Sequence, residues 1–158
     1  MNVHGFRFMI LAALAATGFT AVSVADVSGP VQASEIKWGP APAVMPKGAE
    51  LAVLAGDPAK EGPVTLRLKM PKGYDFPAHW HPTDERVTVI SGEFGLGMGD
   101  KLDKKASKVL KAGGYAIAPA HMNHYAWTKT GAVVQVDLMG PFAITYVNPA
   151  DDPSKQQK

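Results

Sequence analysis

The sequence has no cysteine, and it is poor in charge. Without cysteine the chain forms no disulfides, and a lipid anchor attached to cysteine is excluded. Only 19% of the 158 residues are charged, the formal net charge is +2, and the basic residues form no stripe interleaved with aromatic residues. Nucleic acid is therefore not an expected partner. The 46% share of hydrophobic residues is typical of one ordinary globular domain.

A charge-free apolar run stands near the N-terminus. Met1 to Arg7 carries a positive charge, and Phe8 to Val24 is rich in alanine, leucine and valine. This layout predicts a secretory signal peptide over residues 1–25, cleaved before Asp26, with Ser34 as a second possible start. An uncleaved membrane anchor is the alternative, but the run is short and diluted by polar residues against the ~20 residues that a spanning helix needs. We expect an exported protein, periplasmic or secreted, without stable membrane insertion after processing.

The rest of the chain divides by composition. Residues 26–49 are rich in proline, alanine and glycine, which sustain neither a helix nor a central strand, so we expect an arm that lies over the domain. Residues 50–148 are predicted to form an all-β barrel domain, and residues 149–158 a polar C-terminal tail. Many short strands at close spacing predict a sandwich or barrel. The runs are Leu51–Leu54, Val64–Met70, Arg86–Ile90, Phe94–Met98, Lys108–Lys111, Tyr115–Ala118, Val133–Met139 and Ala143–Val147.

Turn residues separate these runs. Ser91-Gly92 and Gly113-Gly114 are two such places, where glycine supplies a positive φ. No run after the predicted signal peptide has convincing helical length or caps. Residues 102–110 are the only helix-like candidate, and because they lie between two predicted strands they could instead form a long hairpin loop.

Four of the five histidines follow the predicted signal peptide, in two tight clusters, His79-Trp80-His81 and His121-Met122-Asn123-His124. In a strand, residues two apart share a face, so His79 and His81 present two imidazoles side by side. Glu85 opens the next apolar run and could add a carboxylate, while His124 opens a later strand and could add a fourth ligand. This donor set suits one divalent transition metal ion: iron, manganese, nickel, copper or zinc.

These residues resemble the first sequence motif of the cupin superfamily: Gly73, five residues, His79-Trp80-His81, three residues, Glu85, six residues and Gly92. The second motif is looser, with His121 where the family usually has glycine and His124 where its metal-binding histidine belongs. The resemblance covers residues 51–147 and implies a double-stranded β-helix, a jelly-roll barrel with the metal inside. The chain also looks like a group of small exported single-domain cupins whose activity is not established, so the resemblance implies fold and metal but no substrate.

Two groups of residues near the ligands have alternative interpretations. His121 could be an acid or base beside the metal, or a turn residue, since histidine tolerates a left-handed backbone. Glu85 and His121 are the candidate catalytic residues. Gln135 and Asp137 share one strand face, which could be a polar pocket wall or a solvated outer face.

Apolar side chains complete the list of candidates. Trp80, Tyr125 and Trp127 alternate away from the ligand face, and we expect them to pack or, as exposed aromatics, to form the contact of a homodimer. Four apolar residues could line the pocket or belong to the ordinary core: Phe76, Val87, Val89 and Met98.

The leading functional hypothesis is a metal-dependent oxygenase that acts on a small organic molecule, because four protein ligands leave positions free on a metal that accepts six. One alternative is a non-redox isomerase, lyase or hydrolase that uses the metal as a Lewis acid. It needs a general base, for which His121, Asp137 and Tyr115 are weak candidates. Another alternative is a non-catalytic protein that binds a metal or small ligand.

Overall fold

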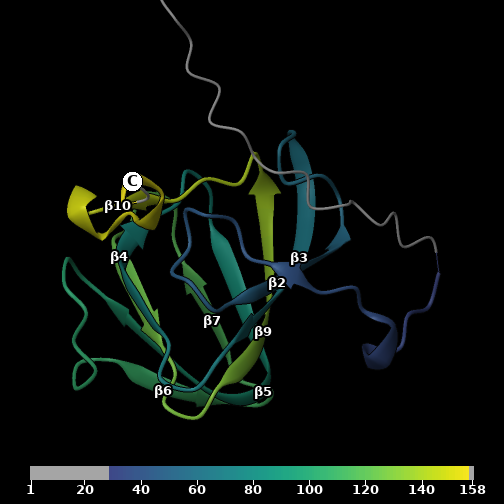
Figure 1. Cartoon of the computed structure of the whole chain (residues 1–158), viewed down its shortest axis with the longest axis horizontal. Coiled ribbons are helices and arrows are strands. Elements are labelled where there is room, and N and C mark those ends of the chain that lie inside the picture. Colours follow the sequence, from purple (N-terminus) through teal and green to yellow (C-terminus); the bar gives the residue numbers. More distant parts are fainter. Residues whose placement is uncertain (1–28, 157–158) are drawn as a thin grey trace, which may run out of the picture.

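The structure is a computed structural model that describes residues 29–156, and its regular elements are nearly all strands (Figure 1). In this range the strands are β1 (Gly39–Pro40), β2 (Glu50–Ala55), β3 (Gly62–Met70), β4 (Asp75–Trp80), β5 (Glu85–Met98), β6 (Lys108–Lys111), β7 (Tyr115–Ala118), β8 (His124–Trp127), β9 (Ala132–Gly140) and β10 (Thr145–Tyr146). Three short 3-10 helices accompany them: η1 (Ala33–Glu35), η2 (Pro149–Asp151) and η3 (Pro153–Lys155). The predicted signal peptide lies outside the described residues. Among the described residues, no helix has the length and apolar character needed to cross a membrane.

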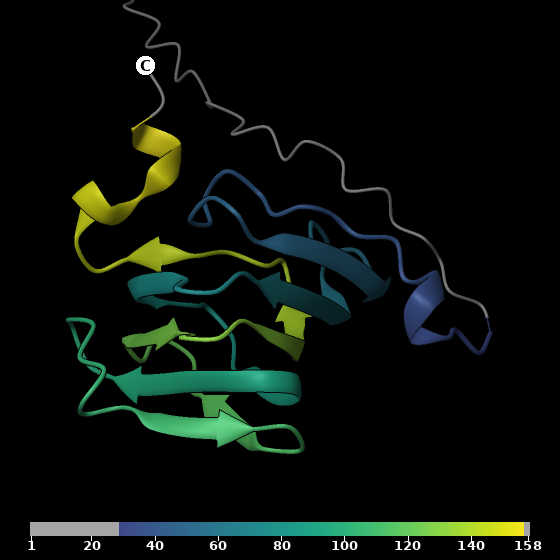
Figure 2. The ribbon, with the colours of Figure 1, turned by 60° about the horizontal axis from the view of Figure 1, so that its bottom comes forward.

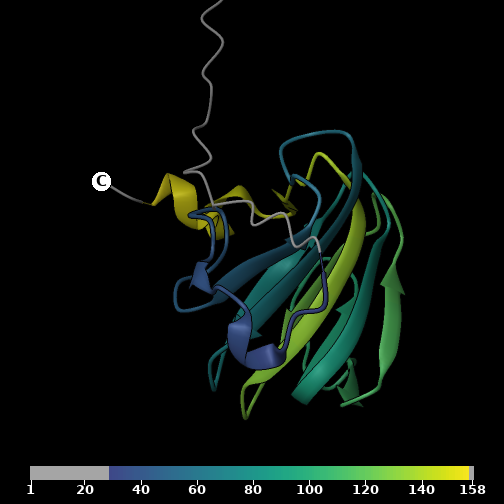
Figure 3. The same ribbon diagram turned by 90° about the vertical axis from the view of Figure 1, so that its right-hand side faces the viewer.

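The strands form one strongly curled antiparallel sheet (Figures 2 and 3). The order is β1-β2-β3-β9-β5-β8-β4-β10, with β6 and β7 both paired to β5. Buried and more exposed side chains alternate along β3 and β9, which pair over their whole length. Because successive side chains of a strand point to opposite faces, one apolar face fills the inside of the curl. The predicted jelly-roll barrel of the cupin type is confirmed.

Strand β5 differs from the prediction of a turn at Ser91-Gly92. It runs unbroken from Glu85 to Met98, pairing with β7 and β9 in its first half and with β6 and β8 in its second. The register to β9 shifts between Val89 and Ser91, and Gly92 has a φ of 78°. This irregularity bends the strand from one part of the sheet to the other without reversing it, as β-bulges do. The predicted turn is therefore wrong.

The helix-like candidate at residues 102–110 is the loop before β6 and part of that strand, which agrees with the hairpin interpretation. The loop covers aromatic side chains of β8. Tyr125 is 1% exposed and donates its hydroxyl hydrogen to the Asp103 carbonyl, and Trp127 donates from Nε1 to Ser107 Oγ. The expectation of an exposed Tyr125 is wrong, because the loop hides the outer face of β8. The homodimer stays a prediction.

The arm before β2 contacts strands at both edges of the sheet. β1 pairs with β2, and the Ala41 amide donates to the Ala49 carbonyl. On the other side, the hydroxyl of Tyr146 in β10 donates to the Val44 carbonyl. The blue arm accordingly passes beside the yellow C-terminal segment in Figure 3. The side chain of Met45 is buried in the core.

Candidate metal centre

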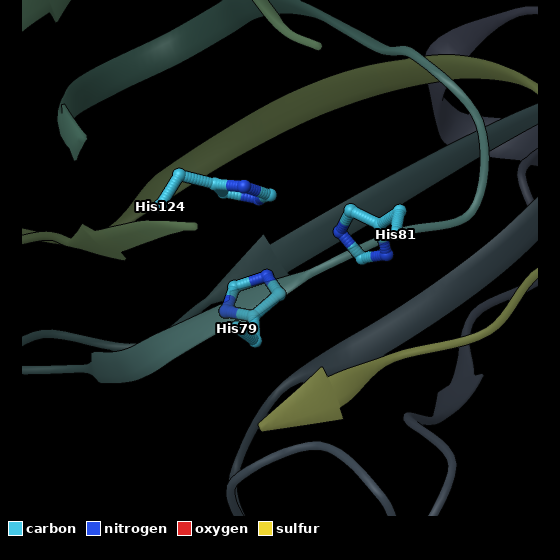
Figure 4. A group of neighbouring side chains, drawn as sticks. All are labelled: His79, His81 and His124. Atoms are coloured by element: carbon cyan, nitrogen blue, oxygen red, sulfur yellow. The ribbon is translucent and has the colours of Figure 1, made fainter. Parts of the chain in front are cut away.

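Three histidines meet inside the barrel (Figure 4). His79 lies on β4, His81 follows the end of that strand, and His124 begins β8. The antiparallel pairing of β4 with β8 sets His79 opposite His124. Their candidate ligand atoms all lie within 4.8 Å of one another, and each of the three residues is at most 3% exposed. These three buried histidines could hold a metal ion.

Backbone carbonyls fix the orientation of all three rings. The Nδ1 atoms of His79, His81 and His124 lie 2.7, 2.7 and 2.9 Å from the carbonyl oxygens of Pro77, Ala143 and Met122. A carbonyl oxygen only accepts, so Nδ1 carries the proton and Nε2 of each neutral ring keeps its lone pair. A hydrogen bond from the second ring nitrogen is the usual support of a metal-binding histidine.

Two of these Nε2 atoms have no hydrogen-bond partner among residues 29–156. Nε2 of His81 and Nε2 of His124 are buried and accept no hydrogen bond from the described residues. A buried polar atom without a partner costs free energy of about 1–3 kcal/mol, and coordination of a cation would remove that cost. The chemistry of the donor set therefore fits a metal ion.

Glu85 begins β5 beside the histidines. Its Oε1 lies 3.7 Å from His81 Nε2, and its Oε2 lies 3.5 Å from His124 Nε2. Both distances exceed those of a good hydrogen bond, and they suit donors around a common centre. In the segment between β4 and Glu85, the Thr83 hydroxyl donates to the Met139 carbonyl. The Glu85 side chain is 14% exposed, whereas the Nε2 atoms of His81 and His124 that face it are buried.

The electrostatics favour the metal-binding forms of Glu85 and His79, whereas at His124 they favour the protonated ring, with which a metal ion would compete. Burial by itself would raise the pKa of Glu85, but His81 and His124 outweigh it and lower the pKa to about 2. Burial, together with the neighbouring imidazoles, lowers the pKa of His79 to about 3. For His124 burial acts downward, yet Glu85 raises its pKa above the ordinary value. At neutral pH the carboxylate is ionised and His79 is neutral.

Aromatic rings pack against the histidines from the apolar side. Phe76 stacks on His79 with ring centroids 4.1 Å apart and planes at 19°, and Phe142 stacks on His81 at 5.4 Å and 28°. These contacts restrict the rotation of both imidazoles.

The four polar residues line one cavity of about 30 Å³. Such a volume accommodates about two water molecules. The remaining wall is apolar: Met45, Leu51, Leu66, Leu68, Met70, Phe76, Val87, Phe94, Leu96, Ala126, Val134, Val136 and Phe142. Phe76 and Val87 are thus pocket residues, whereas Val89 is ordinary core and Met98 is 45% exposed.

His121 is not brought to the cavity. It is exposed, its ring lies 5.0 Å from that of Trp80, and its φ is 60°. The turn interpretation is confirmed by this left-handed backbone. Its amide donates to the His81 carbonyl, which links the two histidine clusters through the backbone. A catalytic role for His121 stays a prediction.

The polar face of β9 is the outer one. Asp137 accepts a hydrogen bond of 2.7 Å from Thr65 Oγ1, and Gln135 Nε2 donates to Asp137. Neither lines the cavity, whereas their neighbours Val134 and Val136 do. Sequence reasoning gave no role to Met45 and Phe142, and no spacing relative to the histidines could have marked them.

Comparison with known proteins agrees with this fold. The family model described as "Domain of unknown function (DUF4437)" matches residues 24–145. No curated protein matches the sequence.

Several solved structures are similar. An RmlC-like cupin from Shewanella frigidimarina is 19% identical with a TM-score of 0.55, over 69% of this chain and 87% of that one. The polyketide cyclase RemF from Streptomyces resistomycificus is 16% identical with a TM-score of 0.62, over 82% and 93%. A protein from Methylibium petroleiphilum described as a "putative acetylacetone dioxygenase" is 22% identical with a TM-score of 0.60, over 79% and 84%. At these identities the likeness to cupins shows the fold alone. The family match covers most of the chain, so the protein belongs to the family described as DUF4437.

Proposed function

We propose that this protein binds one divalent transition metal ion through Nε2 of His79, His81 and His124 and the carboxylate of Glu85, and that it oxidises a small organic molecule with dioxygen. The observation that carries the proposal is the cluster of three buried imidazoles, whose candidate ligand atoms lie within 4.8 Å of one another beside the Glu85 carboxylate. Three nitrogen donors and one oxygen donor suit iron, manganese, nickel, copper or zinc. When bound, such an ion supplies redox chemistry towards dioxygen and a Lewis-acidic position for a substrate oxygen.

The charges of the chain's own residues favour an anionic substrate. Three neutral imidazoles and one carboxylate leave a divalent site with one unit of positive charge inside an apolar wall. An unpaired charge is costly in such surroundings, so a singly negative ligand binds best because it neutralises the site. We infer that the substrate enters as a carboxylate or an enolate.

The wall also bears on the Lewis-acid alternative. Among the described residues that line the cavity, the four candidate ligands are the only titratable side chains. Tyr115 is 54% exposed and Asp137 is bound to Thr65 on the outer face. Isomerase or lyase chemistry needs a separate proton acceptor, and this part of the chain places none beside the site. The oxygenase hypothesis is favoured over the Lewis-acid alternative, because oxidation at the metal ion has less need of a separate protein base.

The small volume of the cavity favours a second candidate function, the binding of a metal ion without turnover. A cavity of about 30 Å³ excludes large substrates but does not restrict the ion itself. The description of the Methylibium protein names acetylacetone, so we include diketones among the compounds that separate the two functions.

Oxygen uptake tests the proposal. Wild type and Glu85→Gln are loaded anaerobically with Fe(II), matched in metal content, and given short carboxylates, oxo acids, diketones and phenols. We expect uptake by wild type with at least one short oxyanion and a loss of about 10²-fold or more in Glu85→Gln, because the change alters the charge of the site. If the ion stays bound but no compound causes oxygen uptake, the oxygenase proposal is contradicted, and metal binding without turnover is the function that remains.

A further inference from the structure

One residue of the cavity wall comes from the arm. Met45 is 4% exposed and lines the cavity together with the candidate ligands. It belongs to none of the strands, whereas most of the other apolar wall residues lie on them. The size of the cavity therefore depends on a side chain that the sheet itself does not hold.

Hydrogen bonds hold the backbone on both sides of Met45. The hydroxyl of Tyr146 donates to the Val44 carbonyl at 2.7 Å, and the hydroxyl of Tyr74 donates to the Pro46 carbonyl at 2.8 Å. The Met45 amide donates to the Pro42 carbonyl at 2.8 Å, which closes a turn. With its neighbours fixed in this way, the Met45 side chain is directed into the cavity.

The long side chain of methionine fills space that a small residue would leave open. Methionine is unbranched and adapts to irregular gaps, so it closes a cavity without strain. With Met45 in place the free volume is about 30 Å³, close to that of two water molecules. Short oxyanions make the smallest demand on this space, and each added carbon or ring needs room that the Met45 side chain occupies.

We propose that Met45 is a specificity-determining residue, which limits the ligands of the metal cavity to short-chain carboxylates and enolates. The inference rests on the proposed metal site for the anionic end of the ligand, and it narrows the proposed substrate to the smallest members of its class. Truncation of Met45 should open the cavity to longer apolar chains.

Ligand binding without turnover tests the proposal. Wild type, Met45→Ala and Met98→Ala are loaded with Co(II), and its visible spectrum is followed during titration with formate, acetate, butanoate and benzoate. Wild type should bind formate and acetate at least about tenfold more tightly than the two larger anions, since a fixed apolar wall discriminates by about that factor for each added carbon. Met45→Ala should bind butanoate at least about tenfold more tightly than wild type does, with little change for formate.

The matched control is Met98→Ala. It removes the same atoms from a methionine that is 45% exposed and does not line the cavity, so its size limit should equal that of wild type. An equal size limit in Met45→Ala and wild type would overturn the proposal. Should Met45→Ala not fold, Met45→Val carries the same comparison with a smaller truncation.

A second measurement needs no metal. Xenon occupancy is determined in crystals of the metal-free proteins, because an enlarged apolar cavity takes up xenon. We expect xenon at the position of the missing side chain in Met45→Ala and none there in wild type. If cobalt does not bind to wild type, the proposed metal site fails, and xenon alone then decides whether Met45 limits the cavity. Absence of xenon from Met45→Ala would refute that role.

Discussion

The imidazoles of His79 and His124 face each other across the ladder between β4 and β8, with ring centroids 4.4 Å apart. Two residues 45 positions apart in the sequence, 124 − 79, are thus held together by backbone pairing. Both histidines lie on paired strands, so the position of their rings does not depend on a loop. The site is therefore expected to be preformed before an ion binds.

The first prediction concerns the candidate ligands. Wild type should bind about one transition metal ion per chain, and His81→Ala or His124→Ala should lose at least about tenfold in affinity, because each removes one donor that water replaces poorly. His121→Ala is the matched control, since that histidine is exposed and outside the cavity. Elemental analysis and competition with a chelator measure the affinities. Equal affinity in all four proteins would contradict the assignment.

The second prediction is that acid releases the metal. Only an unprotonated imidazole binds a metal. Burial acts downward on the pKa of His124, but Glu85 raises it above the ordinary value, so protons compete with the metal at His124. Affinity should be constant at high pH and should fall by about tenfold per pH unit once His124 competes, near or above the ordinary histidine pKa of about 6.5. Calorimetric titrations between neutral and acidic pH check the slope. A constant affinity down to pH of about 5 would show that His124 is not a ligand.

The third prediction concerns alkaline stability. Burial raises the pKa of Tyr74, and burial with nearby negative charge raises that of Tyr146. Above the unfolded tyrosine pKa of about 10, the unfolded chain releases protons that the folded chain keeps, so the free energy of unfolding falls as pH rises. The variant with Tyr74→Phe and Tyr146→Phe should lose about 1 kcal/mol per hydrogen bond at neutral pH but show a weaker alkaline decline. Urea unfolding at several pH values measures the free energy of unfolding at neutral pH and its decline at alkaline pH. An equal alkaline decline in the variant and wild type would show that the two tyrosines do not cause it.

The fourth prediction concerns the contact between β5 and β8. A Cβ atom on Gly95 would collide with the indole of Trp127, so Gly95→Ala should destabilise the fold by about 1–3 kcal/mol. Gly39→Ala is the control, because no atom lies within 4 Å of the added Cβ, and its effect should stay within about 0.5 kcal/mol. Thermal unfolding compares the two. Equal stabilities would mean that Trp127 moves aside without cost.

The fifth prediction concerns export, which we propose from the sequence of residues 1–25. Protein recovered from its native host should lie outside the cytoplasm and begin at Asp26 or Ser34. N-terminal sequencing identifies the start. Recovery of the chain with Met1 intact would refute processing.

Local sequence pattern determined most of the strands and the candidate ligands. Alternation of apolar and polar residues in β3 and β9 depends only on the two-residue period of a strand, and it predicted which residues share a face, but not which face of β9 is the inner one. The partners of His79 and His124, the carbonyls of Pro77 and Met122, lie two residues before each histidine, so these orientations are also local. The candidate ligands His79, His81 and Glu85 could be predicted for the same reason, because they lie close together in the sequence.

Only the tertiary structure decided the environment of the site. The Nδ1 partner of His81 is the carbonyl of Ala143, 62 residues away, and Met45 reaches the cavity from the arm. The outward position of Asp137 and the burial of Tyr125 beneath a loop depend likewise on long-range packing. Sequence periods fix which residues share a face of one element. Which face is covered, and by what, depends on contacts between distant segments, and a single sequence carries no local signal for them.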